Sequence, residues 1–144
     1  EYIRKAQKSK LKDQIYEFYK KKYPIEIIES TIPLIRERIK KLSDYFSLCE
    51  FIFQNPEKYE IDFKDKKELI QNCVTEIKNV PDWSAIKIGE AMQTVATQMN
   101  LKNSEFFMYL RVAITGKKIS PPLNESMELL GKEKVLRYLE RLIK

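Results

Sequence analysis

The most informative part of this chain is the stretch Leu110-Arg-Val-Ala-Ile-Thr-Gly-Lys-Lys-Ile-Ser-Pro-Pro-Leu123, where one apolar helical pattern ends and another begins. Gly116 can adopt the left-handed conformation that ends a helix. The two prolines fix φ at about −65° and push the residue before them towards extended geometry. Because Lys117 and Lys118 lie in the same turn, the pattern predicts a stiff, basic corner that suits a polyanion.

The remaining hydrophobic patterns are also helical, and no segment of four or more residues alternates convincingly at period two. We therefore predict an all-α fold, with a hinge at Gly131. Cap candidates are Ser30-Thr31, Asp65 in a capping-box-like pair with Glu68, and Asp82. The predicted helices cover residues 4–21, 25–29, 32–42, 43–53, 65–78, 84–98, 103–114, 123–130 and 132–143.

The segment Asn79-Val-Pro-Asp82 is the best candidate for a joint between two parts of the chain. It divides the sequence into two small stacked helical subdomains, residues 1–79 and 80–144. Trp83 follows this joint, and either base stacking or packing against a neighbouring helix would explain it. We favour packing, because a tryptophan beside a helix start usually has a structural role.

Composition indicates an ordered domain with little capacity for catalysis. Of its 144 residues, 43% are hydrophobic and 33% are charged, and no apolar run reaches the roughly 18 residues of a membrane span. Histidine is absent, which removes the commonest general base and metal ligand. Cys49 and Cys73 lie in apolar helical patterns without the spacing of a metal site. We expect two buried thiols and no metal site.

The basic residues are concentrated at the two ends of the chain, whose formal net charge is +6. Residues 1–22 carry eight basic and three acidic side chains, and residues 132–144 carry five and two. This distribution suits a protein that meets phosphate along part of its surface. Solvated helix faces would explain the same charges.

The pattern R-x-A-[LI]-T-G-[KR]-x-x-x-P-x-L, which begins at Arg111, is followed by a helical segment that contains Leu-Gly-Lys-Glu. Together they resemble the C-terminus of bacterial-type glutamyl-tRNA synthetases, and a weaker resemblance reaches back to about Tyr23. The resemblance implies the right-handed, multi-helix bundle or cage that binds the anticodon in this class I synthetase family. The chain lacks the catalytic signatures of that class, so we expect a C-terminal piece of a longer ligase.

The resemblance also implies which residues of the corner contact tRNA. It places Arg111 against the anticodon bases, and Ser120, Pro121 and Leu123 beside the first and second anticodon positions. An arginine offers a planar fork of donors and stacks on bases, whereas proline and leucine offer an apolar platform. Alternatively, Arg111 is a helix-surface residue paired with a nearby glutamate.

A second basic cluster, Arg36-Glu-Arg-Ile-Lys-Lys41, resembles the family helix that faces the third anticodon base. There Arg38 matches the position that separates glutamate from glutamine anticodons, which end in C and G, and a donor-only side chain favours the acceptors of cytosine. We expect phosphate contacts from Arg36, Lys117 and Lys118. As an ordinary alternative, Arg36 and Lys40 form an i, i+4 solvated pair.

These observations predict an anticodon-binding domain that positions tRNA(Glu) for ATP-dependent glutamylation by a catalytic domain of the same polypeptide. The resemblance assigns ATP and Mg²⁺ to that catalytic domain and implies no cofactor here. From the sequence itself, which has no membrane-length apolar run, no signal-peptide pattern and no leftover apolar seam, we expect no membrane contact, a monomer and a cytoplasmic or organellar location. One alternative is a non-discriminating synthetase that also accepts tRNA(Gln). Another is a basic helical adaptor for an acidic protein, and a third, an enzyme in its own right, has only scattered carboxylates and lysines to offer.

Overall fold

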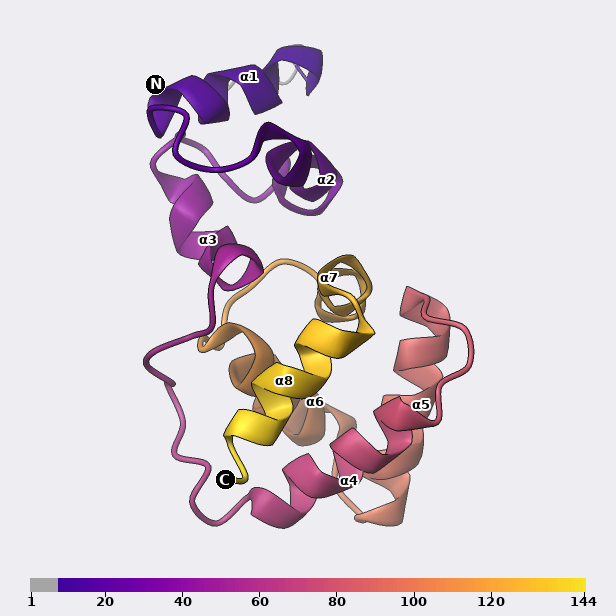
Figure 1. The fold of residues 1–144 in the computed structure, drawn as a ribbon. Coiled ribbons are helices and arrows are strands. Elements are labelled where there is room, and N and C mark those ends of the chain that lie inside the picture. The colour runs from indigo at the N-terminus through magenta and orange to yellow at the C-terminus, as the bar shows by residue number, and fades with distance from the viewer. Residues whose placement is uncertain (1–7) are drawn as a thin grey trace. The chain divides into compact units, whose positions relative to one another are not determined.

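The computed structural model describes residues 8–144, in which there are eight α-helices and no β-strand (Figure 1). The prediction of an all-α fold is confirmed for this part of the chain. The helices are α1 (Lys8–Phe18), α2 (Ile25–Ile35), α3 (Asp44–Phe53), α4 (Lys67–Lys78), α5 (Ala85–Gln98), α6 (Asn103–Thr115), α7 (Leu123–Leu130) and α8 (Lys132–Arg141).

The chain folds into two compact units, of which the first ends at Gln54 and the second begins at Asn55. This division differs from the boundary expected after residue 79, because α4 packs against α5 and α8 and so lies within the second unit. Lys132 at the start of α8 strengthens that packing by donating to two backbone carbonyl oxygens at the end of α4, at 3.1 and 2.8 Å. The predicted joint is therefore a turn inside one unit.

In the first unit, α2 is a single helix where two had been predicted. The hydroxyls of Ser30 and Thr31 donate to carbonyl oxygens three residues earlier, at 2.8 and 2.7 Å, and do not cap a new helix. Ile28, Ile32 and Ile35 form an unbroken buried stripe at spacings of four and three residues. This stripe favours one continuous helix, which ends at Ile35, directly before the second basic cluster.

Aromatic side chains hold the first unit together. Tyr45 is fully buried, and its hydroxyl lies 2.7 Å from the hydroxyl of Thr31. The Tyr19 hydroxyl accepts from the backbone N–H of Phe46 at 3.1 Å and donates to a carbonyl oxygen before α3. The Tyr23 ring stacks on that of Phe46, with centroids 5.0 Å apart. These contacts join α2, α3 and the loop between α1 and α2.

In the second unit, the helices enclose a mainly aliphatic core, and two helix starts differ from the prediction. Ser84 caps α5 by accepting from the third residue of the helix at 3.3 Å, whereas α4 begins without a side-chain cap. The caps predicted at Asp82 and Asp65 are therefore wrong. The Trp83 indole N–H donates to the carbonyl of Met127 at 3.0 Å, which confirms its structural role.

Candidate nucleic-acid interface

The corner, residues 115–121, begins where α6 ends. Thr115 is 7% exposed, and its hydroxyl lies 2.8 Å from the carbonyl oxygen of Arg111 and 2.9 Å from that of Lys117. The same hydroxyl accepts from the backbone N–H of Lys117 at 3.1 Å. Gly116 then takes the left-handed conformation, with φ of 83°. One buried hydroxyl and one glycine therefore end the helix and start the turn.

Residues 56–60, which we call the strap, lie against the corner and hydrogen-bond to it. The backbone N–H of Glu60 donates to the carbonyl of Gly116 at 2.9 Å, and the Glu60 carboxylate accepts from the backbone N–H of Lys118 at 2.6 Å. A Cβ atom on Gly116 would lie 2.7 Å from the carbonyl oxygen of Lys58 and 3.1 Å from Pro56. The glycine is thus required both by its conformation and by the close approach of the strap.

Arg111 connects the last turn of α6 to the far end of the corner. Its Nη1 donates to the hydroxyl oxygen of Ser120 at 2.7 Å and lies 3.4 Å from the carbonyl oxygen of Pro121. The Ser120 hydroxyl in turn donates to that carbonyl at 2.7 Å. The half-buried guanidinium therefore lies beside the corner, as the sequence predicted.

The side chains of the corner differ sharply in exposure. Ser120 and Leu123 are only 3% and 6% exposed, and Pro121 is also buried. Lys118 is exposed, and Ile119 is 77% exposed. Pro121 and Leu123, which were expected to form an apolar platform for bases, therefore lie inside the fold. Lys118 and Ile119 project from it.

The second basic cluster is a turn, residues 36–41, which we call the basic turn. Arg38 was predicted to lie on a helix, but α2 ends at Ile35 and Arg38 is exposed in the turn that follows. The Asp44 carboxylate accepts from the backbone N–H groups of Lys40 and Lys41 at 3.0 and 3.1 Å. These two hydrogen bonds stabilise the ionised carboxylate and lower the pKa of Asp44. Because α2 ends at Ile35, Arg36 and Lys40 do not lie on one helix, as the i, i+4 alternative requires.

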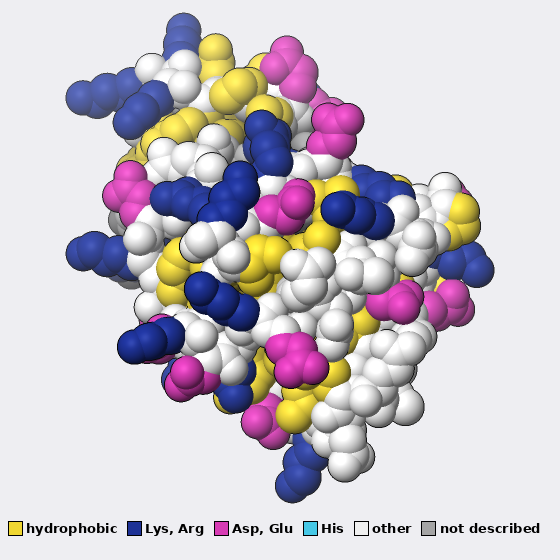
Figure 2. Space-filling view, turned by 60° about the horizontal axis from the view of Figure 1, so that its bottom comes forward, with side chains coloured by type: hydrophobic (Ala, Val, Ile, Leu, Met, Phe, Trp, Pro, Cys, Tyr) yellow, Lys and Arg dark blue, Asp and Glu magenta, His cyan; other side chains and the backbone are white. Residues whose placement is uncertain are grey.

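Basic and acidic side chains are interspersed on the surface. On the face shown in Figure 2, acidic side chains (magenta) lie between the basic ones (dark blue). Ion pairs join Lys12 to Glu29 at 2.9 Å and Lys87 to Glu90 at 3.5 Å, and exposed pairs of this kind add little stability. On this face, anion binding would therefore depend on local geometry more than on a continuous patch of positive charge.

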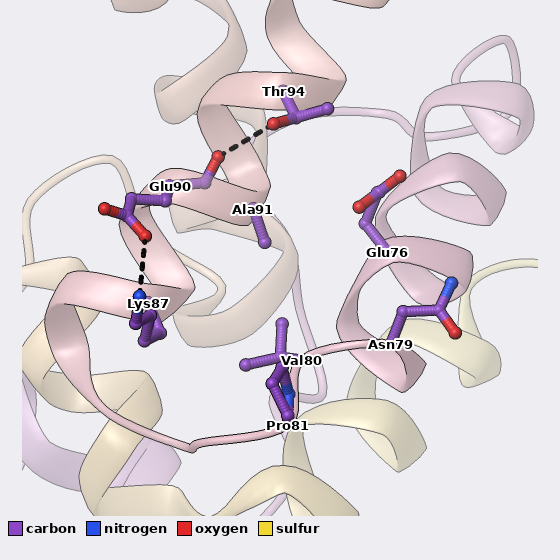
Figure 3. Close-up of a pocket in the computed structure, with 8 residues that line it drawn as sticks. All are labelled: Glu76, Asn79, Val80, Pro81, Lys87, Glu90, Ala91 and Thr94. Carbon is purple, nitrogen blue, oxygen red and sulfur yellow. Dashed lines mark hydrogen bonds and ion pairs between the residues drawn. The ribbon is translucent and has the colours of Figure 1, made fainter.

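A cavity of about 280 Å³ lies between α4 and α5 of the second unit (Figure 3). Glu76 and Glu90 are on its walls, and Lys87 is already paired with Glu90. Two carboxylates make it unsuitable for phosphate. The full lining comprises Glu76, Asn79, Val80, Pro81, Lys87, Glu90, Ala91 and Thr94.

Burial raises the pKa of several side chains in the described part of the chain, including that of Tyr45. Burial raises the pKa of Cys49, Cys73 and Tyr138 to about 12 in each case. Both thiols are buried and free, which confirms the prediction for them. Among residues 8–144 no cluster of three or more His, Cys, Asp or Glu side chains could hold a metal ion, and no helix there is long and apolar enough to cross a membrane.

Residues 4–143 match the sequence model of a protein family described as an anticodon binding domain. This chain belongs to that family. A glutamate–tRNA ligase from a Nocardioides species is 33% identical over 79% of the chain, and one from Dehalococcoides mccartyi is 34% identical over 73%. These alignments cover 25% and 23% of the two ligases, so the anticodon-binding chain spans about a quarter of the curated relatives it matches.

Solved structures support the fold of this anticodon-binding domain. A crystal structure of a glutamate tRNA ligase from Elizabethkingia meningosepticum superimposes with a TM-score of 0.77 and 21% sequence identity. The superposition covers 94% of this chain and 29% of the ligase. The glutamyl-tRNA synthetase of Elizabethkingia anophelis gives a TM-score of 0.75 at 20% identity. The helical arrangement is therefore the one found in these ligases.

The anticodon-binding domain brings together one of the two predicted groups of tRNA contacts. Arg111, Ser120 and Pro121 are joined by hydrogen bonds in the second unit, and Leu123 begins the next helix. Arg36 and Arg38 lie in the first unit. Sequence reasoning missed Glu60, since only folding brings a residue this far along the chain to the corner, and it missed the exposure of Ile119.

Proposed function

We propose that this chain binds the anticodon loop of tRNA(Glu) and positions the tRNA for ATP-dependent glutamylation by a catalytic domain of the same polypeptide. The observation that carries the proposal is the corner, where Arg111 is anchored beside the half-buried Lys117 and the exposed Lys118 in a chain of the anticodon-binding family. ATP and Mg²⁺ would act in the catalytic domain. A monomer, in the cytoplasm or an organelle, is part of the same proposal.

The corner supports recognition of unstacked bases. Single-stranded loops are read by side chains that hydrogen-bond base edges or contact base faces, and Arg111 offers a planar donor group for this purpose. Lys117 and Lys118 would contact phosphates. Ser120, Pro121 and Leu123 are buried, so we assign them mainly to holding the corner and Arg111 in place. A preformed corner loses little conformational entropy when RNA binds.

The test measures binding of the 144-residue chain to the anticodon stem-loop of tRNA(Glu) and to the same stem-loop with its anticodon bases replaced. Each measurement is made at two salt concentrations, because phosphate contacts weaken as salt rises and base contacts do so much less. We expect tighter binding to the correct loop at both concentrations. We also expect Arg111→Ala to remove most of that preference, while Arg111→Lys keeps the charge and only part of the preference.

Circular dichroism of both Arg111 variants would show whether they remain folded. Equal, purely salt-dependent binding of the two loops by the parent chain would refute anticodon recognition. That result would leave the basic adaptor as the better description.

We further propose that Arg38 favours a C over a G at the third anticodon position, which would make the parent ligase discriminate against tRNA(Gln). Its exposure in the basic turn leaves the guanidinium accessible to a base. The test compares Arg38→Gln with the parent chain on stem-loops that differ only in that third base. We expect the preference for C to fall by about 10-fold, since a good bidentate contact contributes about 1–3 kcal/mol of discrimination. An unchanged preference would favour the non-discriminating alternative or another reader of that base.

A further inference from the structure

We infer that Ile119 is the residue of the corner that contacts the face of an unstacked anticodon base, an inference that rests on the proposed function. The side chain is 77% exposed, although the residue that follows it is only 3% exposed. Thr115, at the start of the corner, is also buried. Ile119 is therefore the apolar side chain that the corner presents to solvent.

Exposure alone would not single out Ile119, because isolated apolar side chains are common on protein surfaces. Its backbone is the deciding feature. On one side, the N–H of Lys118 is bound to the Glu60 carboxylate at 2.6 Å, and on the other the hydroxyl of Ser120 accepts from Arg111 at 2.7 Å. Both neighbours are thus fixed, and the isoleucine cannot turn into the core without breaking these bonds.

The chemistry around Ile119 fits a nucleotide better than an apolar partner. Two lysines precede it directly and Lys118 is exposed, so a ligand that covers the isoleucine lies near positive charge. An unpaired nucleotide combines an apolar base face with a phosphate in this way. A β-branched side chain has few χ1 rotamers and therefore loses little entropy on contact.

The experiment compares Ile119→Ala with Ile86→Ala in binding to the anticodon stem-loop of tRNA(Glu). Ile86 is a matched control, because it is 74% exposed and belongs to the same unit. We expect Ile119→Ala to weaken binding by about 5- to 10-fold, as partial loss of an apolar contact predicts. The dependence of affinity on salt should stay unchanged, and Ile86→Ala should bind like the parent chain.

A second measurement identifies the base. The stem-loop is made abasic at each anticodon position in turn, and each version is titrated with the parent chain and with Ile119→Ala. If Ile119 contacts one base, the effect of Ile119→Ala disappears when that base is missing, whereas it persists at the other positions. An effect that persists with every abasic loop would overturn the inference, because it would show that the side chain acts through the fold of the corner.

The two hypotheses fail in different ways. If the parent chain prefers the correct loop but Ile119→Ala binds it equally well, this inference is wrong and the proposed function stands. If the parent chain does not distinguish the correct loop from the base-replaced loop, the proposed function is refuted and the inference with it.

Discussion

The corner and the basic turn are both short basic segments that follow a helix, yet they are held very differently. In the corner, the Thr115 hydroxyl, the Arg111 guanidinium and the Glu60 carboxylate all bond to the backbone or side chains of residues 115–121. In the basic turn, the Asp44 carboxylate accepts from two consecutive backbone N–H groups. The corner thus has three supports, of which two come from α6 and one comes from the strap.

The two segments therefore suit different kinds of contact with a nucleic acid. A segment with several independent supports keeps its donors and apolar groups in fixed positions, and fixed positions are what discrimination between bases requires. The bonds of the basic turn named here join it to residues close in sequence, and such a segment can still offer charge, which attracts phosphate without reading sequence. We therefore expect the corner to tolerate substitution poorly and the basic turn to tolerate it well.

The strongest test of this contrast is Gly116→Ala. A left-handed alanine is strained, and its Cβ would lie 2.7 Å from the backbone carbonyl oxygen of Lys58. Strain and overpacking together predict a loss of about 2–4 kcal/mol from the free energy of unfolding of the second unit. Urea unfolding followed by circular dichroism measures this loss.

Gly89→Ala is the matched control. Its Cβ would meet only the end of the Asn124 side chain, at 2.9 Å, and alanine favours a helix by about 1 kcal/mol over glycine. We expect a change of about 1 kcal/mol or less. If Gly116→Ala were as stable as the parent chain, the close approach of the strap would not constrain the corner.

The next largest effect is expected from Thr115→Val, which keeps the shape of the side chain and removes its hydroxyl. The buried hydroxyl bonds to the backbone on both sides of the turn, so its loss leaves buried polar groups without a partner. We expect a loss of about 1–2 kcal/mol in the same unfolding measurement. Thr94→Val is the control, because that exposed hydroxyl donates to a carbonyl four residues earlier, just as Thr115 does. Equal losses for the two variants would contradict the special role of the corner.

The sequence predicted much of the fold because most of the helices carry strong apolar periodicity. Helices α3 to α8 appear close to their predicted ends. The prediction failed in the region of α2, where Ser30 and Thr31 are residues that usually cap helices but here bond backwards along one helix. No local pattern separates these two uses of a hydroxyl, because the choice depends on the buried face of the helix, to which Thr31 itself belongs.

The candidate site was predictable only where its parts are neighbours in sequence. Arg111, Ser120 and Pro121 lie within one turn of chain and were expected together. Glu60 is 58 residues from Lys118, and nothing in the sequence links them. The burial of Leu123 and the exposure of Ile119 also depend on how the whole corner folds back onto α6 and the strap.

The third prediction concerns phosphate contacts. Its effect is smaller, and it is measured on the affinity for RNA and not on stability. Each lost contact to a single strand lowers the slope of log affinity against log salt by about 0.7. The double variant Lys117→Ala, Lys118→Ala should therefore lower the slope by about 1.4, and Arg36→Ala by about half as much. Lys64→Ala with Lys67→Ala removes the same charge from exposed positions outside the site. We expect no change in slope for that control, and an equal change would show that only net charge matters.

The smallest effect is expected from Asp44→Asn in the basic turn. The amide is a weaker acceptor than the carboxylate for the N–H groups of Lys40 and Lys41, so the melting temperature at pH 7 should fall by about 1–2 °C. Because folding lowers the pKa of Asp44, its contribution is complete above the ordinary pKa of about 3.9 and is lost as the pH falls through the lower folded value.

The difference in melting temperature between the parent chain and Asp44→Asn should therefore be constant from pH 7 to about 5 and should shrink as the pH falls below the ordinary pKa of about 3.9. Thermal unfolding followed by circular dichroism at several pH values measures it. Asp13→Asn removes a charge from the exposed surface of α1 and controls for net charge. A difference that persisted unchanged at the lowest pH would show that the carboxylate is not what orders the basic turn. A loss as large as that of Thr115→Val would remove the contrast between the two segments, since the basic turn would then depend on its support as strongly as the corner does.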